Sequence, residues 1–308
     1  MRNRFAETLY QCALENPEIY VVVADISPAG SMAKFREQHP SRFLNVGVAE
    51  QTMIGICAGL SLKGCQPFAY TIANFSLYRP FEMVRNDLCY QNLPVTVVGM
   101  GAGVVYSTLG STHHTQEDVA VASAIPNLRV LSPCDPLETN EATRYCAFQK
   151  EGPVYLRLGK TGEPNLTEGA LEPFSFGRIR RIRAGRDTAI LGYGPILRMG
   201  AAIAERLERE RGESVSLVSV HTIKPLDQAG IAAIIGSHRR VVVIEENVPH
   251  GGLGSRVKEI AWDMKARADV QCFSLRDEFI HYYGEHEELL RLHGLDEARI
   301  YAAITGSP

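Results

Sequence analysis

The sequence predicts an α/β protein built from two parallel- or mixed-sheet α/β domains. Short apolar runs rich in β-branched residues alternate with stretches of helical periodicity, which is the pattern of strands buried between layers of helices. The polar, turn-rich stretch 161–169 interrupts this pattern, and 308 residues give room for two domains of ordinary size. We therefore expect one domain over residues 1–165 and a second over residues 175–308.

The first domain is expected to begin with a helix. Phe5, Leu9 and Cys12 recur at helical spacing, and Asn16-Pro17 then ends the pattern. The apolar run 20–24 suits a buried parallel strand. A helix follows Gly47 and another covers about 137–148, while further strands are expected at 67–70, 95–99, 128–131 and 154–158.

The second domain repeats the alternation of strands and helices. Strands are expected at 188–191, 215–220, 241–244 and 271–275, and helices at 197–210, 228–235 and about 255–265. Strands that alternate with helices in this way favour a parallel sheet covered on both faces.

Composition and charge exclude several classes of function. The formal net charge of −3 gives no basic footprint for a nucleic acid. No apolar run approaches the ~20 residues that span a bilayer, and the first residues lack the apolar core of a signal peptide. The seven cysteines form no Cys-x-x-Cys pair, and no Cys/His set has zinc spacing. We expect a cytoplasmic protein with no membrane or nucleic-acid partner and no metal ligands of its own.

The most informative stretch is 42–51, RFLNVGVAEQ, which places Glu50 just past a small-residue turn at the start of an apolar helix. The buried character of this region is expected to come from Val46, Val48, Ile54, Ile56 and Leu60. A carboxylate in such a place either complements the helix dipole or acts as a buried proton carrier. The residues alone leave both interpretations open.

This run resembles the pyrimidine-domain signature of transketolases, and further motifs follow in that family's order with similar spacing. They are VVVADIS (21–27), PFAYTIANFSLYRPFEMVRND (67–87), LPVTVVGMGAG (93–103), GSTHHTQEDVA (110–120), IPNLRVLSPCDPLE (125–138), GPVYLRLGK (152–160), VSVHTIKPLD (218–227) and VVVIEENVPHGGLGS (241–255). The resemblance covers nearly the whole chain. It implies a thiamine diphosphate pyrimidine-binding domain followed by a transketolase C-terminal domain.

The resemblance implies that Glu50 serves thiamine diphosphate chemistry. In this family the cofactor's own 4′-amino group removes the C2 proton after a shift to the imino form, which needs a proton exchanged at the opposite ring nitrogen. A carboxylic acid in a dry pocket suits that exchange, because burial favours its neutral form. The resemblance also implies that Phe75, Tyr78, Ile26 and Ile72 line the cofactor pocket. Core packing alone is the alternative for Phe75 and Tyr78.

The same resemblance implies where the substrate binds. His113 falls on the family's Thr-His site beside the reacting centre, where an imidazole can bond hydroxyls and move protons near neutral pH. Lys160 and Arg157 lie where related enzymes place a cation for the sugar phosphate, although a cation after a strand is more often merely solvated. His114 is expected to be a surface or interface residue.

Three positions depart from the family pattern. Many transketolases carry an aspartate four residues before the pocket histidine, where this chain has Leu109. The family's phosphate-side histidine corresponds to about Gly101, and its serine near the first strand to about Ala29. The substrate is therefore expected to be an unusual sugar, with or without a phosphate.

Two glycine-rich stretches allow other interpretations. Residues 99–103, GMGAG, follow a strand, but no sustained helical pattern comes next, so they do not meet the context of a dinucleotide fingerprint. Residues 251–254, GGLG, precede a helix and favour a tight, closely packed turn over an anion site.

Thiamine diphosphate enzymes hold the diphosphate and Mg²⁺ with a Gly-Asp-Gly motif, which this sequence does not contain. We therefore expect a partner, the N-terminal diphosphate-binding subunit of a split transketolase, which holds most of the Mg²⁺ shell. Cyclic two-fold symmetry is the usual way such subunits close, so an α2β2 heterotetramer in which this chain also homodimerises is expected.

Four alternatives stay open at this point. A deoxyxylulose-phosphate-synthase-like enzyme and a 2-oxo acid dehydrogenase beta subunit share the two-domain plan. A non-catalytic regulatory or structural subunit would not need Glu50, Phe75 and His113. A nicotinamide-dependent dehydrogenase is disfavoured by the context of its glycines.

Overall fold

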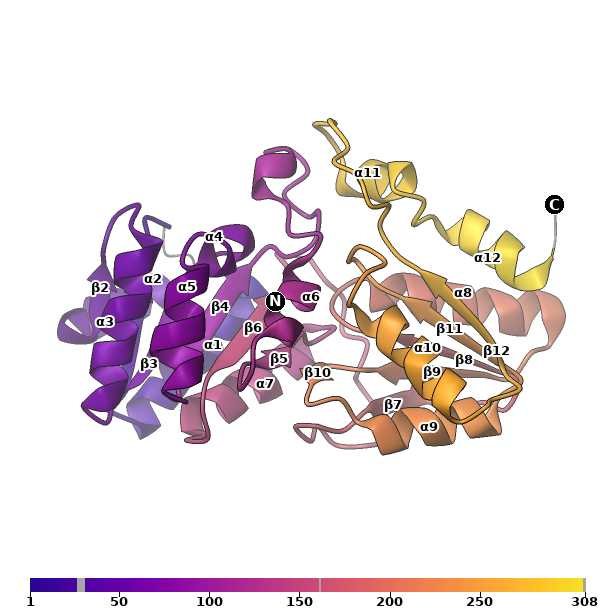
Figure 1. Cartoon of the computed structure of the whole chain (residues 1–308), viewed down its shortest axis with the longest axis horizontal. Helices are drawn as coiled ribbons and strands as arrows, with labels where there is room; N and C mark the ends of the chain where they lie inside the picture. Colours follow the sequence, from indigo (N-terminus) through magenta and orange to yellow (C-terminus); the bar gives the residue numbers. More distant parts are fainter. Residues whose placement is uncertain (27–30, 161, 307–308) are drawn as a thin grey trace.

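The computed structural model describes residues 1–26, 31–160 and 162–306, and it contains two α/β units that lie side by side (Figure 1). The first holds a seven-stranded sheet and the second a five-stranded sheet. The predicted fold class is confirmed, and both sheets are mixed because each carries one antiparallel edge strand. Ala29 lies outside the described residues.

The first sheet has the order β10-β5-β6-β4-β3-β1-β2, and only β10 runs antiparallel to its neighbour. Its strands are β1 (Ile19–Val23), β2 (Phe43–Asn45), β3 (Gln66–Ile72), β4 (Thr96–Met100), β5 (Arg129–Leu131), β6 (Val154–Leu158) and β10 (Thr222–Lys224). The strands expected from continuous apolar runs are all present. The short edge strands β2 and β10 were not predicted.

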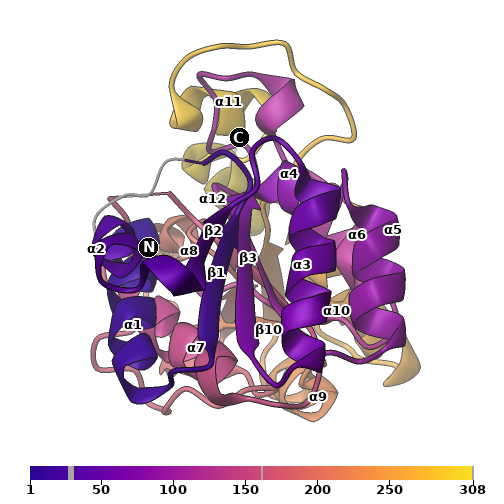
Figure 2. The same ribbon diagram turned by 90° about the vertical axis from the view of Figure 1, so that its left-hand side faces the viewer.

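Helices cover both faces of this sheet (Figure 2). One face carries α1 (Arg2–Glu15), α2 (Ser31–Gln38) and α7 (Pro136–Phe148). The other carries α3 (Glu50–Leu62), α5 (Phe81–Met83), the π-helical η2 (Val84–Tyr90) and α6 (Asp118–Ala124). The short helices are α4 (Ala73–Leu77), η1 (Pro40–Arg42) and η3 (Ser111–His113). Alternate residues of a strand point to opposite faces, so Val21 and Val22 join different apolar clusters.

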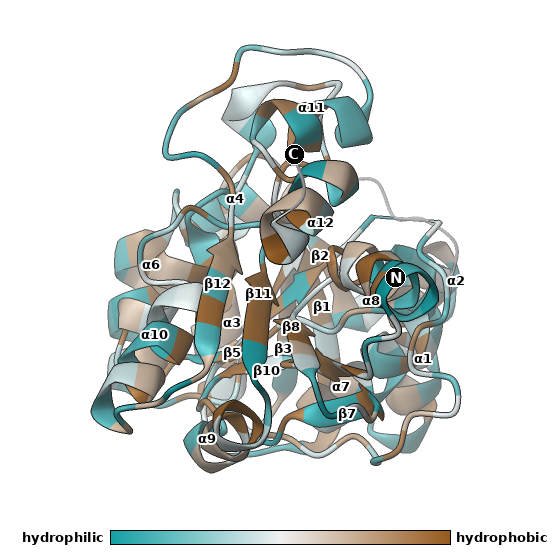
Figure 3. Ribbon diagram, turned by 90° about the vertical axis from the view of Figure 1, so that its right-hand side faces the viewer, coloured by the Kyte–Doolittle hydropathy of each residue, from teal (hydrophilic) through white to brown (hydrophobic). Residues whose placement is uncertain are grey.

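The second sheet has the order β12-β11-β8-β9-β7. Its strands are β7 (Arg180–Arg183), β8 (Thr188–Gly192), β9 (Val215–Ser219), β11 (Arg240–Ile244) and β12 (Asp269–Phe273), and its helices are α8 (Leu197–Arg211), α9 (Gln228–Ser237), α10 (Leu253–Asp263), α11 (His286–Leu292) and α12 (Glu297–Thr305). Figure 3 shows the hydrophobic strands β8 and β11 at the middle of this sheet. Val243 packs toward α9 and α10, and Val242 toward α8 and α12.

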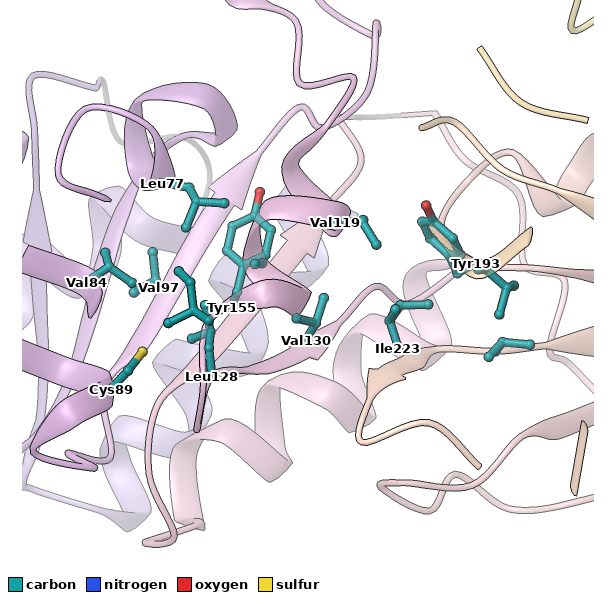
Figure 4. Close-up of a cluster of buried hydrophobic side chains, with 14 of the residues drawn as sticks. Leu77, Val84, Cys89, Val97, Val119, Leu128, Val130, Tyr155, Tyr193 and Ile223 are labelled. Atoms are coloured by element: carbon teal, nitrogen blue, oxygen red, sulfur yellow. The ribbon is translucent and has the colours of Figure 1, made fainter. Parts of the chain in front are cut away.

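The two units are joined by more than the connecting chain. Strand β10 comes from the second half of the sequence but pairs with β5 of the first sheet. One hydrophobic cluster runs across the boundary, and Figure 4 shows Val119 and Val130 on one side of it with Ile223 and Tyr193 on the other. The boundaries 1–165 and 175–308 stay a prediction, and the first sheet includes a strand from the second half of the sequence.

The connecting stretch is anchored to the first unit. The Asp135 carboxylate accepts hydrogen bonds from the backbone N–H groups of Leu166 and Thr167 at 2.7 and 2.6 Å. The same side chain caps α7 by accepting from the Glu138 N–H at 2.7 Å. None of the helices in the described residues is both long and apolar enough to cross a membrane.

Candidate active site at the carboxyl edge of the first sheet

The carboxyl ends of five parallel strands, β1, β2, β3, β4 and β6, meet along one edge of the first sheet. Val23 of β1 is level with Asn45 and Tyr70, and Met100 of β4 is level with Ile72 and Leu158. The loops that follow these strands therefore come together, which is where open α/β sheets place ligands. Each predicted site residue lies at the end of one of these strands or in the segment that follows it.

Glu50 is the first residue of α3 and is only 2% exposed. A turn sets its position, because the Asn45 side chain accepts hydrogen bonds from the N–H groups of Asp25 at 3.2 Å and Gly47 at 3.0 Å. Gly47 takes φ of 71°, a value that favours glycine. The prediction that Val48 is buried is wrong: it is 69% exposed, because the turn directs it away from the core.

Arg79 is a site residue that sequence reasoning missed. Its Nη1 lies 2.7 Å from Glu50 Oε2, and its guanidinium carbon lies 4.9 Å from the centre of the Phe75 ring. The ion pair compensates a carboxylate that would otherwise be buried alone. The one signal in the sequence is the four-residue spacing from Phe75, which places the two side chains on the same face of a helical segment.

Phe75 and His113 meet edge to face. Their ring centroids are 5.3 Å apart with an interplanar angle of 72°. Asn74 donates a hydrogen bond to the Thr112 carbonyl, and the Thr112 hydroxyl lies 3.1 Å from His113 Nδ1. Contacts therefore run from Glu50 through Arg79 and Phe75 to His113, and the structure brings together three predicted residues.

The other predicted pocket residues expose only part of their side chains to a ligand. Ile26 and Ile72 are half-buried at the ends of their strands. Tyr78 packs against the apolar cluster beneath α3, and burial raises the pKa of its hydroxyl, with Asp118 and Glu117 adding to the effect. The inward position of that hydroxyl supports the core-packing interpretation of Tyr78 more than direct contact with a ligand.

The two candidate cations differ sharply. Lys160 is half-buried, and its Nζ lies 5.0 Å from the centre of the Tyr106 ring. Arg157 is 2% exposed, and its Nε donates to Asp118 at 2.8 Å while Nη2 donates to the Glu246 carbonyl at 2.9 Å. The expectation that Arg157 is solvated or binds a sugar phosphate finds no support, because its guanidinium already joins the two units.

The positions that depart from the family pattern have clear structural consequences. Gly101 has φ of 70°, and a Cβ there would lie 2.0 Å from the Tyr106 ring. Tyr106 therefore fills the space beside Gly101. Leu109 is 44% exposed on the loop that carries His113. The family resemblance implies an imidazole and a carboxylate at these two positions. The chain instead has a glycine beside the Tyr106 ring and the apolar side chain of Leu109.

His114 is buried between the two units, so the interface interpretation fits and the surface interpretation does not. Burial lowers the pKa of its imidazole. The ring lies close to His293, which is also buried and whose two ring nitrogens have no hydrogen-bond partner within the described part of the chain.

The glycine-rich stretches form turns. No helix follows residues 99–103, as expected for a chain without a dinucleotide fingerprint. At residues 251–254, the N–H groups of Leu253 and Gly254 both donate to the Glu245 carboxylate at 2.8 Å. The protein's own side chain thus satisfies the N-terminus of α10, and this explains why that helix begins at Leu253 rather than Ser255.

The residues at the sheet edge fit an aminopyrimidine. A buried carboxylate pairs with a guanidinium that lies over an aromatic ring, and half-buried apolar side chains lie at the carboxyl ends of neighbouring strands. Such a carboxylate can exchange a proton with a ring nitrogen, while the aromatic ring can pack against a flat heterocycle. Among the described residues, no group of three or more His, Cys, Asp or Glu side chains could hold a metal ion.

Comparisons with known proteins define the class. Residues 1–163 match the transketolase pyrimidine-binding domain, and residues 177–300 match the transketolase C-terminal domain. The chain belongs to the transketolase family and is a subunit of a thiamine-diphosphate-dependent transketolase.

Three relatives show which members of the family this chain is similar to. A subunit of the apulose-4-phosphate transketolase of Phocaeicola vulgatus is 30% identical, over 97% of this chain and 94% of that protein. The 1-deoxy-D-xylulose-5-phosphate synthase of Alkaliphilus oremlandii is 33% identical over 97% of this chain, which spans 47% of that enzyme. A solved structure described as a split gene transketolase, inactive beta4 tetramer, superposes with a TM-score of 0.87 at 33% identity, covering 99% of this chain and 97% of that one.

Proposed function

We propose that this chain is the pyrimidine-binding half of a split transketolase and transfers a two-carbon ketol unit from a ketose to an aldose acceptor. The observation that carries the proposal is the buried Glu50 at the sheet edge, linked through Arg79 to the Phe75–His113 pair. Thiamine diphosphate, when bound, supplies the nucleophilic carbon for this reaction.

The chain's own residues orient the cofactor and move protons. Glu50 holds a proton at its carboxylate and exchanges it with the pyrimidine, a step that is general acid–base catalysis. Phe75 offers a ring for the pyrimidine to pack against, worth about 0.5–1.5 kcal/mol beyond the area it buries. His113 and Lys160 face the substrate, where His113 bonds hydroxyls and Lys160 attracts an anionic group. Gly101, beside which the Tyr106 ring lies, and Leu109 stand where the family pattern has groups that contact an ordinary sugar phosphate, which supports a modified sugar as substrate.

A partner chain completes the site in this proposal. Helix α3 presents apolar and small residues on its outer side, and a Cβ at Gly55 or Gly59 would meet nothing within 4 Å. Exposed Val48 and Leu62 extend that surface at the two ends of the helix. A helix that is apolar on its exposed side as well as its buried side is typical of one covered by another subunit. We propose that the diphosphate-binding subunit packs here and holds most of the Mg²⁺ shell.

The proposed assembly is an α2β2 heterotetramer in which two copies of this chain also contact each other. The names of the relatives support it, since one is named as a transketolase subunit and another is a split-gene enzyme that is inactive as a beta4 tetramer. All seven cysteines are free, which supports a reducing compartment, and we propose the cytoplasm.

Reconstitution tests this proposal. The purified chain, given thiamine diphosphate and Mg²⁺, is expected neither to bind the cofactor tightly nor to turn over a ketose, and both properties should appear when the diphosphate-binding subunit is added. Turnover by the chain alone would overturn the two-chain site. One relative supports a second candidate, a deoxyxylulose-phosphate-synthase-like reaction. Formation of 1-deoxy-D-xylulose 5-phosphate by the reconstituted complex, in place of ketol transfer, would favour that candidate.

A further inference from the structure

The loop that carries His113 is closed at its base and depends on the second unit for its position. It leaves β4 and returns at Thr115, where the Thr115 N–H donates to the Gly103 carbonyl at 2.8 Å and the Gly103 N–H donates to the Thr115 hydroxyl at 2.7 Å. His113 lies two residues before this closure. The ends of such a loop lie close together, so the groups that fix its base also restrict the backbone near His113.

Glu246 fixes the base from the other unit. It leaves the end of β11 and is 4% exposed. Its Oε1 accepts a hydrogen bond from the Val104 N–H at 2.6 Å, and a Cβ at Gly103 would lie 2.4 Å from the Glu246 carboxyl carbon. Two residues further on, the Val248 N–H donates to the Gln116 carbonyl at 2.6 Å. The segment 246–248 thus holds both ends of the loop.

A second segment of the same unit holds the tip of the loop. The Ser107 hydroxyl donates to the Gly284 carbonyl at 2.6 Å, and the Ser111 hydroxyl donates to the Ile280 carbonyl at 3.1 Å. The loop after β4 and the segment before α11 project side by side above the sheets (Figures 1 and 2). This second segment leads into His286, whose Nε2 lies 3.1 Å from Glu246 Oε1. The segments that hold the tip and the base of the loop are therefore linked through the Glu246 carboxylate.

The Glu246 side chain contributes a negative charge as well as packing contacts. Burial would raise the pKa of its carboxyl, but His286 and Arg157 outweigh that effect and hold the pKa below its ordinary value. The carboxylate is thus ionised while it accepts the Val104 N–H, and hydrogen bonds to an ionised acceptor are shorter and stronger than neutral ones.

We propose that Glu246 is a positioning residue that holds the His113 loop in its working geometry, with His286 tying the tip segment to the same carboxylate. It touches no substrate and acts through His113, so the proposal rests on the role proposed for His113 above. A shift of about 1 Å in a positioned group can cost on the order of 10²-fold in rate.

Three variants test the proposal on the isolated chain. Glu246→Ala removes the acceptor for Val104, whereas Glu246→Gln keeps an oxygen there without the charge. Glu245→Gln is the matched control, because Glu245 is the neighbouring buried carboxylate and its bonds go to Tyr193, Leu253 and Gly254 rather than to the loop. The readout is the NMR signal of the His113 ring, which Phe75 displaces through its ring current and which His113→Ala assigns.

The expected result is a His113 signal that moves toward its free position in Glu246→Ala, moves partly in Glu246→Gln and does not move in Glu245→Gln. An unchanged signal in Glu246→Ala, or in Glu246→Gln if the alanine variant does not fold, would overturn the proposal. An equal displacement in Glu245→Gln would show general loosening of the second unit and would overturn it too.

A double-mutant cycle in the reconstituted complex adds a kinetic readout. Glu246→Ala is expected to lower kcat/KM by roughly 10- to 100-fold in the native background and to change it little in the His113→Ala background, because the residue acts through His113. Independent, additive losses would overturn the proposal. If His113→Ala has no effect on turnover, the role proposed for His113 fails, and the NMR signal alone decides whether Glu246 positions the loop.

Discussion

Glu50 lies in the site with its charge already compensated. The Glu50–Arg79 pair joins a buried carboxylate to a guanidinium that is well exposed on its other side. The structure pairs this carboxylate with a cation, whereas proton exchange with a pyrimidine requires a carboxyl group that can also carry a proton. Glu50 can meet both needs if Arg79 moves off toward Phe75 or solvent when the pyrimidine arrives, and the exposure of Arg79 leaves it free to do so.

Replacing Glu50 by Gln tests the proton-exchange role. The amide keeps the shape and can still accept from Arg79, so folding and assembly should be nearly unchanged. It cannot exchange a proton in the same way, and turnover of the reconstituted complex is expected to fall at least ~10²-fold. Hydrogen–deuterium exchange at the C2 position of the bound cofactor should slow in parallel. Native exchange rates in the variant would remove Glu50 from this role.

Among the helices and strands, the sequence predicted those whose own residues carry a clear apolar or amphipathic pattern. Strands β1 and β11 are largely β-branched apolar runs, and α8 has an amphipathic pattern that ends at Gly212 in the left-handed conformation. Strand β7, with the sequence RRIR, has no apolar run to indicate it. Its Arg180 is buried only because Glu141 accepts a hydrogen bond from the guanidinium at 2.7 Å, a contact that no local pattern encodes.

The candidate site shows the same division. Glu50, Phe75 and His113 lie in motifs whose order carries the family resemblance, so the sequence could indicate them. The partner of Glu50 is 29 residues away, and the partner of Val104 is 142 residues away. No local spacing encodes such pairs, since they exist only once two loops or two units have packed together.

The contact between α6 and β6 gives a prediction about stability. Asp118 at the start of α6 is fully buried and accepts from Arg157 Nε and the Tyr155 hydroxyl, both at 2.8 Å. Asp118→Asn leaves the Arg157 charge buried without its partner and is expected to lower the free energy of unfolding by about 3–5 kcal/mol. The matched control is Glu15→Gln, which breaks an exposed pair with Arg144 and should change stability little. Urea unfolding measures both, and equal effects would contradict the prediction.

For the whole molecule, the outer side of α3 predicts how the subunits assemble. Gly55→Arg places a long charged side chain where the isolated fold has open space, so the chain should fold normally but fail to bind the diphosphate-binding subunit. Gly236→Arg is the matched control, a helical glycine with equally open surroundings on α9. Light-scattering mass before and after mixing decides. The native chain is expected to be at least a dimer alone and a heterotetramer with its partner, and normal assembly of Gly55→Arg would place the interface elsewhere.

The join between the two units also predicts a dependence on pH. His286 faces Glu246, Arg198 and Glu287. Burial lowers the pKa of its imidazole, but the Glu246 carboxylate outweighs burial and raises the pKa above its ordinary value. Because the pKa of His286 is higher in the folded than in the unfolded state, its ion pair with Glu246 stabilises the fold fully below the unfolded pKa of about 6.5. This stabilisation is lost as pH rises through the folded pKa. The neighbouring His114 and His293 have lowered pKa values, so they are neutral in this window and weaken the fold only on the acid side.

Amide exchange of the His113 loop checks this. After correction for the intrinsic pH dependence of exchange, protection of the native loop is expected to fall as pH rises above the ordinary histidine pKa of about 6.5. The His286→Gln variant should show weaker protection that is independent of pH over the same range. A native profile that is flat, or that rises with pH, would contradict the prediction.

The second half of the sequence contributes strand β10 to the first sheet, and this has a consequence for synthesis on the ribosome. The first sheet ends at β5 until Thr222–Lys224 has been made, although every other strand of that sheet is complete by Leu158. At about 5–20 residues per second, β5 waits several seconds as a bare edge able to pair with other chains. A nascent chain at this stage is therefore the point at which a chaperone has most to protect, and coding changes that slow translation between these residues should lower the yield of native protein without altering a single side chain.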